Sequence, residues 1–191
     1  EASKLNVPRI GVRFRLPASM NQVEYFGRGP AENYLDRNAG SMVGLYKSTA
    51  EELYFPYVRP QENGHHTDTR WVSLSTGKKG LLIQADNTIG FNALRNSIED
   101  FDDEEATGLS RQWSNFTPEQ VANHDEAAAK NVLRRQHHIN DITPRDFVEV
   151  CVDLKQQGVA GYDSWGSRPE PAYTLPANRE YNWGFTLIPL K

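Results

Sequence analysis

Strict alternation of apolar and polar side chains is the sequence feature that most limits what this chain can fold into. The stretch RIGVRFRLP (9–17) alternates with a period of two, and so do DFVEVCVDL (146–154) and EYNWGFTL (180–187). Successive side chains of a β-strand point to opposite faces, so this period predicts strands with one face buried. A helix would need apolar residues at a period of about 3.6. We therefore expect β-strands near both ends of the chain.

Four shorter stretches fit the same prediction, and each is bounded by Gly, Asn or Asp: QVEYFG (22–27), TRWVSLS (69–75), GLLIQAD (80–86) and IGFNAL (89–94). Seven or more short strands with turn signals between them favour an all-β antiparallel sandwich over an α/β fold. At 191 residues the chain is long enough for a sizeable core and suits a single domain, residues 1–191.

One segment departs from the strand pattern. Thr117, Pro118 and Gln120 form a helix start, and an Ala-rich run ending in Arg134 and Arg135 comes after them. This predicts one or two short helices over 117–136. Separately, TAEEL (49–53) predicts a single capped turn.

Composition excludes several classes of protein. No apolar run reaches the roughly 18 residues of a membrane span. A net charge of −4 without a Lys/Arg block argues against nucleic-acid binding. Cys151 is the single cysteine, which excludes an internal disulfide. We expect a soluble protein, cytoplasmic or periplasmic, that binds neither nucleic acid nor membrane.

Two patterns that could suggest a metal ion do not meet the requirements of a site. A calcium loop starting at Asp100 would need Gly at its sixth and Glu at its twelfth position, where the chain has Glu105 and Arg111. The adjacent histidines at 65–66 and at 137–138 point to opposite faces of an extended chain, so each pair offers at most one ligand. We expect no metal ligands in this chain.

The stretch FGRGPAENYLDR (26–37) is the first candidate for a functional loop. Its glycines permit backbone angles closed to other residues, its proline stiffens the adjoining backbone, and several polar side chains come next. The simpler interpretation is a tight turn in which Asp36 and Arg37 pair. PYVRPQENG (56–64) has a similar composition. The candidate residues are Gly27, Arg28, Gly29, Pro30, Glu32, Asn33, Tyr34 and Asp36, with Glu62 and Asn63 as supporting residues.

Trp165 lies in a second candidate loop, GYDSWGSRPEP (161–171), whose glycines and prolines forbid a long helix. The ring could cover the protein's own core. It could instead stack on the C–H face of a sugar while Asp163 and Ser164 address the hydroxyls.

Catalysis has weaker support from the residues themselves. Glycoside hydrolysis needs two carboxylates roughly 5 to 9.5 Å apart, and the sequence does not give the separation of Glu32, Glu62 and Asp163. Two alternatives remain open. One is an aldose epimerase that uses His65 or His66 as acid with Glu62 as base. The other is a stand-alone carbohydrate-binding module with Trp165 as its platform.

Three long stretches, taken together, resemble a known family. FGRGPAENYLDR, YFPYVRPQENGHHTDTRW (54–71) and GVAGYDSWG (158–166) occur in the order and approximate spacing of the C-terminal domain of glycoside hydrolase family 2 β-galactosidases. The resemblance covers essentially the whole chain. It implies a galactose-mutarotase-like β-sandwich that comes after a catalytic (β/α)8 barrel in a longer polypeptide.

The resemblance also implies residue roles. The catalytic glutamates would belong to the barrel, so none lies in this chain. Trp165 would stack on the aglycone sugar of a β-galactoside such as lactose, and residues 27–36 would border the same pocket as a loop that shifts between open and closed forms. Leu35, Ala160 and Tyr162 stand where family members commonly have proline, glycine and aspartate.

The same resemblance implies partners and cofactors. We expect contacts with the other domains of the polypeptide, a role in assembly, and a homo-oligomeric parent enzyme. No cofactor is implied for this domain, because the magnesium and sodium ions of the parent enzyme would lie in other domains.

Overall fold

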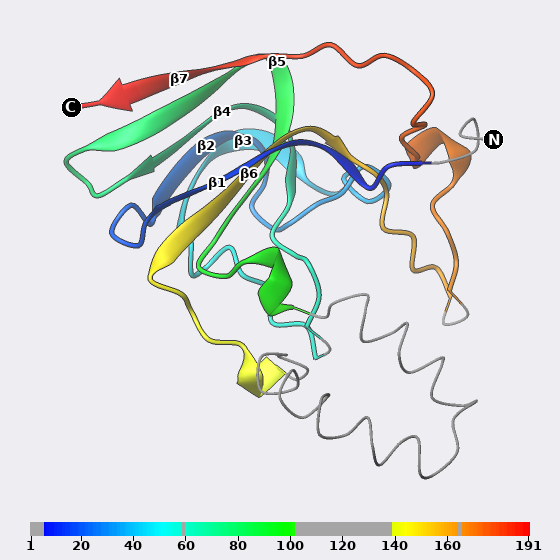
Figure 1. Ribbon diagram of the computed structural model, residues 1–191, viewed down its shortest axis with the longest axis horizontal. Helices are drawn as coiled ribbons and strands as arrows, with labels where there is room; N and C mark the ends of the chain where they lie inside the picture. Colours follow the sequence, from blue (N-terminus) through cyan, green and yellow to red (C-terminus); the bar gives the residue numbers. More distant parts are fainter. Residues whose placement is uncertain (1–5, 59, 102–138, 164–165) are drawn as a thin grey trace, which may run out of the picture. The chain divides into compact units, whose positions relative to one another are not determined.

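The structure is a computed structural model that describes residues 6–58, 60–101, 139–163 and 166–191 (Figure 1). The chain divides into two compact units. The larger unit comprises Glu1–Phe55, Asn63–Arg95 and Arg145–Lys191 and holds every described strand. The smaller unit comprises Pro56–Glu62 and Asn96–Pro144, and its described part contains the short 3-10 turns η2 (Ile98–Asp100) and η3 (Ile139–Asp141).

The strands of the larger unit form one antiparallel sheet in the order β1-β6-β5-β4-β2-β3, with β7 paired to β5 (Figure 1). This confirms the predicted all-β class. The predicted helices at 117–136 lie outside the described residues, and among the described residues no helix could cross a bilayer. The strands are β1 (Arg9–Pro17), β2 (Gln22–Gly29), β3 (Met42–Thr49), β4 (His66–Ser75), β5 (Gly80–Leu94), β6 (Phe147–Gln156) and β7 (Phe185–Leu190).

Strand β5 corrects one detail of the sequence prediction. The stretches 80–86 and 89–94 were expected as separate strands, but they form one strand of 15 residues. Its first half pairs with β4 and β7, and its second half pairs with β4 and β6. The pairing with β4 shifts register between Gln84 and Ile89, so the polar residues 86–88 lie at an irregularity with paired residues on both sides. The pairing on either side overrides the local turn preference.

Two other strands also differ from expectation. The strand expected over 180–187 begins only at Phe185, so Tyr181 and Trp183 precede it. Strand β3 was not predicted at all, and it lies at the edge of the sheet. Edge strands carry a weaker apolar pattern because only part of their surface is covered.

Strand β6 lies between β1 and β5 in the sheet. Its apolar and polar side chains alternate, yet residues on both of its faces are buried. Val150 and Val152 are buried, and so are the alternate residues Glu149 and Asp153. Both carboxylates face arginines of β1. The distance from Arg15 Nε to Glu149 is 3.1 Å, and that from Arg9 Nη2 to Asp153 is 2.8 Å. Pairing of this kind is what makes a buried carboxylate tolerable.

The predicted capped turn at 49–53 is confirmed. The Thr49 hydroxyl accepts the backbone amide of Glu52 at 3.2 Å, and the Glu52 carboxylate accepts the backbone amide of Thr49 at 3.0 Å. These two hydrogen bonds form the reciprocal capping box expected from the spacing of threonine and glutamate.

Candidate functional site

The predicted site residues Gly27, Arg28 and Gly29 belong to strand β2 rather than to a loop. Neither glycine has a positive φ, so the expected freedom of backbone angle is not used. Gly27 is required for a different reason, since a Cβ there would lie 2.9 Å from the Thr69 Cα on the neighbouring strand. The loop itself therefore starts at Pro30, after a cis Gly29–Pro30 peptide bond.

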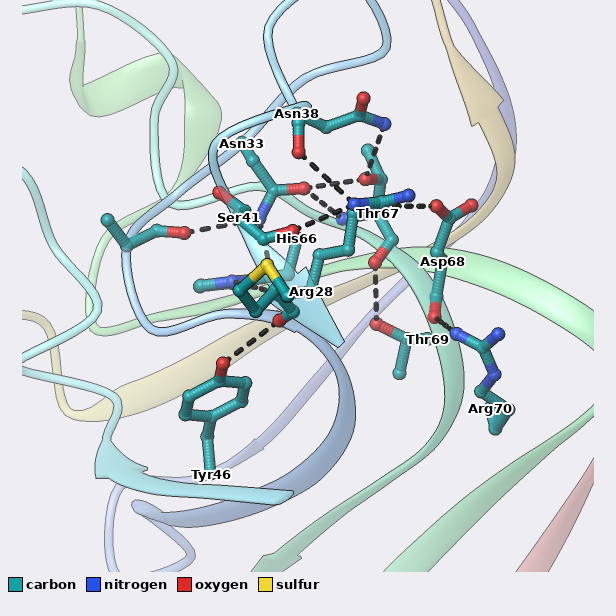
Figure 2. Close-up of polar contacts among 12 residues, drawn as sticks. Arg28, Asn33, Asn38, Ser41, Tyr46, His66, Thr67, Asp68, Thr69 and Arg70 are labelled. Carbon is teal, nitrogen blue, oxygen red and sulfur yellow. Dashed lines mark hydrogen bonds and ion pairs between the residues drawn. The ribbon is translucent and has the colours of Figure 1, made fainter. Parts of the chain in front are cut away.

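Arg28 binds the backbone at Asn38 and Ser41, where the loop leads toward β3 (Figure 2). Its Nε donates to the Asp68 carboxylate at 2.5 Å, and its Nη1 donates to the carbonyls of Ser41 at 2.8 Å and Asn38 at 3.3 Å. The guanidinium is a planar donor with several N–H groups, so it can hold one carboxylate and two carbonyls at once.

Asn33 forms the buried centre of the loop (Figure 2). Its side chain is completely buried and donates to the carbonyls of Arg28 and Ala31, each at 3.1 Å. Its amide oxygen accepts the backbone amide of Thr67 at 3.0 Å and the Thr67 hydroxyl at 2.6 Å. The full hydrogen-bonding capacity of the side chain is thus used to shape the backbone.

Glu32 joins the loop to the start of β4. Its Oε2 accepts the backbone amide of Gly64 at 2.7 Å and the Tyr34 hydroxyl at 3.2 Å, while Oε1 accepts Arg37 Nη2 at 2.7 Å. Arg37 also lies over the Tyr34 ring, 4.8 Å from its centroid. The simpler interpretation of this stretch had Asp36 and Arg37 paired, whereas in the structure Arg37 pairs with Glu32.

Asp36 contacts the second candidate loop. Its Oδ2 accepts the backbone amide of Ala160 at 2.7 Å, and its Oδ1 accepts that of Val159 at 3.1 Å. A Cβ at Gly158 would lie 2.6 Å from the Asp36 Cγ, so glycine is needed for this close approach. The structure thus brings together residues that are more than 120 positions apart in the sequence.

The second loop is described except at Ser164 and Trp165, which lie outside the described residues. Asp163 Oδ1 accepts the backbone amide of Ser167 at 3.3 Å. The Tyr162 ring is 59% exposed, and its hydroxyl oxygen accepts the backbone amide of Glu170 at 3.2 Å. An aromatic ring is therefore held at the surface within three residues of Trp165.

A buried polar cluster lies behind the first loop. His65 stacks on Tyr34, with 5.6 Å between ring centroids, and its Nδ1 lies 2.8 Å from Asn92 Oδ1. Arg9 donates to the same Asn92 oxygen at 2.9 Å and pairs with Asp153. Loss of hydration on burial lowers the pKa of His65 to about 3.

The neighbouring His66 ring stacks on Phe91, and burial lowers its pKa to about 4. Both histidines are 1% exposed and therefore neutral at ordinary pH. A general acid needs a proton to give and access to the substrate, so this arrangement does not favour the epimerase hypothesis.

The supporting residues occupy different units. Asn63 is buried in the larger unit, where its side chain accepts the backbone amide of Phe55 at 2.9 Å and its carbonyl accepts Asn92 Nδ2 at 2.7 Å. Glu62 belongs to the smaller unit and is partly exposed there. Among the described residues, no group of three or more His, Cys, Asp or Glu side chains is arranged to hold a metal ion.

Several residues that build the site could not be identified from the sequence. Asn38, Ser41, Thr67 and Asp68 hold the first loop through contacts that no local pattern indicates. The backbone amides that donate to Asp36 could not be identified from the sequence either, because every residue except proline has a backbone N–H.

Comparison with known proteins gives the family. A family model described as beta galactosidase small chain matches residues 1–187. A β-galactosidase of Priestia megaterium is 35% identical over 185 residues, which cover 96% of this chain and 15% of that protein. A β-galactosidase of Vibrio cholerae is 29% identical over 181 residues, covering 95% of this chain and 14% of its own length. One from an Arthrobacter species is 42% identical over 99 residues, covering 49% of this chain and 10% of its own length.

The chain folds into one antiparallel sheet, and its sequence matches one part of a much longer β-galactosidase. It is therefore a domain of a glycoside hydrolase. The chain belongs to the β-galactosidase small-chain family. It spans about 15% of the length of the curated relatives it matches.

Proposed function

We propose that this chain forms the aglycone side of the active site of a β-galactosidase that hydrolyses terminal β-D-galactosides such as lactose. The observation that carries the proposal is the contact of Asp36 with Val159 and Ala160. The resemblance assigns residues 27–36 and the loop around Trp165 to one pocket, and a pocket of that kind requires the two stretches to lie against each other.

The proposed role is positioning rather than bond cleavage. Glu32 and Asp36 each accept backbone amides, so both carboxylates are used to hold loops. A retaining glycosidase instead needs two carboxyl groups facing one glycosidic bond, about 5 to 5.5 Å apart. The catalytic glutamates would come from the barrel, and this chain would hold the leaving sugar near the reacting bond.

The surface of the second loop supports a sugar partner. Tyr162 is 59% exposed and Val159 is 42% exposed, so this stretch of the chain offers apolar groups at the surface. Sugars pack their C–H faces on such groups and use their hydroxyls for nearby polar atoms.

The experiment that tests the proposal replaces Trp165 by alanine in the complete gene product. We expect the KM for lactose to rise about tenfold, since loss of an aromatic contact costs on the order of 1 kcal/mol or more. Hydrolysis of an aryl galactoside, whose leaving group is not a sugar, should change much less. Trp183→Phe is the control for altering an indole elsewhere in the larger unit, and unchanged lactose kinetics in Trp165→Ala would refute the proposal.

A further inference from the structure

We propose that Asp36 is a positioning residue that couples the loop of residues 30–37 to the segment 158–163, so that the first loop sets the position of the second and thereby the affinity for the aglycone. This inference rests on the proposed function. It goes further by naming the contact through which the loop of residues 30–37 determines the position of the segment 158–163.

The first step of the argument is the shape of the receiving backbone. Ala160 has a φ of 54°, in the left-handed region, and it comes directly after a residue whose amide points to the same carboxylate. Successive N–H groups in such a conformation form a small concavity that binds anions. Asp36 fills that concavity with both carboxylate oxygens, so its negative charge matters as well as its shape.

The second step is that Asp36 and the backbone at Gly158 are too closely packed to shift relative to each other. Gly158 lies so close that a Cβ there would be 2.5 Å from Asp36 Oδ2. The Gly158 amide is itself held by the Tyr173 carbonyl at 2.8 Å. The segment is thereby fixed on one side by η4 (Pro171–Tyr173) and on the other by Asp36.

The third step concerns the other end of the coupling. The loop that carries Asp36 is held by Glu32 on Gly64, just before β4, and by Asn33 on Thr67, within β4. These bonds tie the backbone shortly before Asp36 to β4 and to Gly64 just before it, so the position of Asp36 depends on the position of this loop. The amides of Val159 and Ala160 would move with it or lose their acceptor.

The test uses the complete gene product with two substitutions that break the contact from opposite sides, Asp36→Asn and Gly158→Ala. Each should raise the KM for lactose about tenfold, the lower end of the range for losing a hydrogen bond to a charged group. Each should leave kcat for an aryl galactoside within about twofold, because the chemistry lies elsewhere. The Val159 and Ala160 amides should exchange with deuterium at least about ten times faster in Asp36→Asn.

The double variant gives the decisive result. Once one substitution has broken the contact, the other has nothing left to break, so its lactose KM should match that of either single variant rather than the product of the two effects. Glu52→Gln is the matched control, because it also neutralises a carboxylate that holds a backbone amide, at the turn after β3. It should leave the lactose KM unchanged.

The outcomes separate this inference from the proposed function. Multiplicative effects in the double variant would overturn the coupling. An unchanged lactose KM in Asp36→Asn, with a raised KM in Trp165→Ala, would also overturn it while leaving the proposed function standing. If Trp165→Ala has no effect either, both proposals fail.

Discussion

The carboxylate of Glu32 accepts the backbone amide of Gly64, with 2.7 Å between Oε2 and the amide nitrogen. The side chain is only 7% exposed. A carboxylate held in this way is fixed to the backbone of a neighbouring segment, so it serves the shape of the loop. This separates Glu32 from the catalytic acids that its position in a polar loop could suggest.

Glu32→Gln should lower the free energy of unfolding by about 2 kcal/mol, since a hydrogen bond to a charged group contributes roughly 1.5 to 3 kcal/mol. Urea denaturation measures this. Glu24→Gln is the control, because Glu24 forms a surface pair with Lys47 at 3.4 Å, and such pairs contribute about 0 to 1 kcal/mol. If Glu32 were a general acid, its substitution would instead remove a limb of the pH–rate profile.

Asn33→Ala should be more damaging, with a loss of about 3 kcal/mol or more. The substitution leaves the buried amide and hydroxyl of Thr67 without their acceptor, Asn33 Oδ1, and each such orphan costs roughly 1 to 3 kcal/mol. Asn38→Ala is the matched comparison, because its side chain donates one hydrogen bond, to the Thr67 hydroxyl at 3.1 Å. Equal losses in the two variants would contradict this account of the loop.

Ala160→Gly should stabilise the fold by about 0.5 to 1 kcal/mol. A left-handed φ costs a residue with a Cβ on the order of 1 to 2 kcal/mol, and glycine gives back part of this as backbone entropy. Gly161→Ala makes the reverse change at a φ of 86°, where no atom of the residues that the structure describes, other than its chain neighbours, lies within 4 Å of an added Cβ. It should destabilise the fold through backbone strain alone, and thermal unfolding of the pair of variants decides the matter.

Acid should destabilise the fold through the two buried histidines. Burial lowers the pKa of His65 to about 3 and that of His66 to about 4, while an unfolded histidine has a pKa near 6.5. Above pH 6.5 both residues are neutral in either state. As the pH falls below that value, the unfolded chain takes up protons that the native state excludes, and stability is lost down to the native pKa values.

The expected loss between pH 7.5 and pH 5.5 is about 3 kcal/mol, from about 1.4 kcal/mol per histidine per pH unit. Urea denaturation at several pH values measures the slope, and His66→Gln should reduce it by the share of one proton. A slope that is identical in the wild type and in His66→Gln would show that His66 is not buried in its neutral form.

The sequence was sufficient for the fold class because alternation depends only on local geometry. Strands β1, β2, β4 and β6 coincide well with the predicted stretches. The errors occur where pairing decides the outcome. The polar residues 86–88 remain within β5 because β4 pairs with the strand on both sides of them, with β7 alongside before them and β6 after them. Strand β3 lies at an edge where burial leaves little pattern.

The candidate site was only partly predictable. The sequence indicated which residues are polar and near glycine or proline, but not what they bond. The sequence left open a pair between Arg37 and its neighbour Asp36, and in the structure Arg37 pairs with Glu32. Asp36 bonds amides 123 and 124 positions away, and a partner of that kind is fixed by the tertiary fold.

The most direct test of the central claim is a crystal structure of the complete gene product with lactose bound in a catalytically inactive variant. We predict that the glucose unit contacts Trp165 and lies within about 4 Å of atoms from residues 158–167, with Asp36 still bonded to Val159 and Ala160. A glucose unit that touches neither this segment nor residues 30–37 would contradict the account.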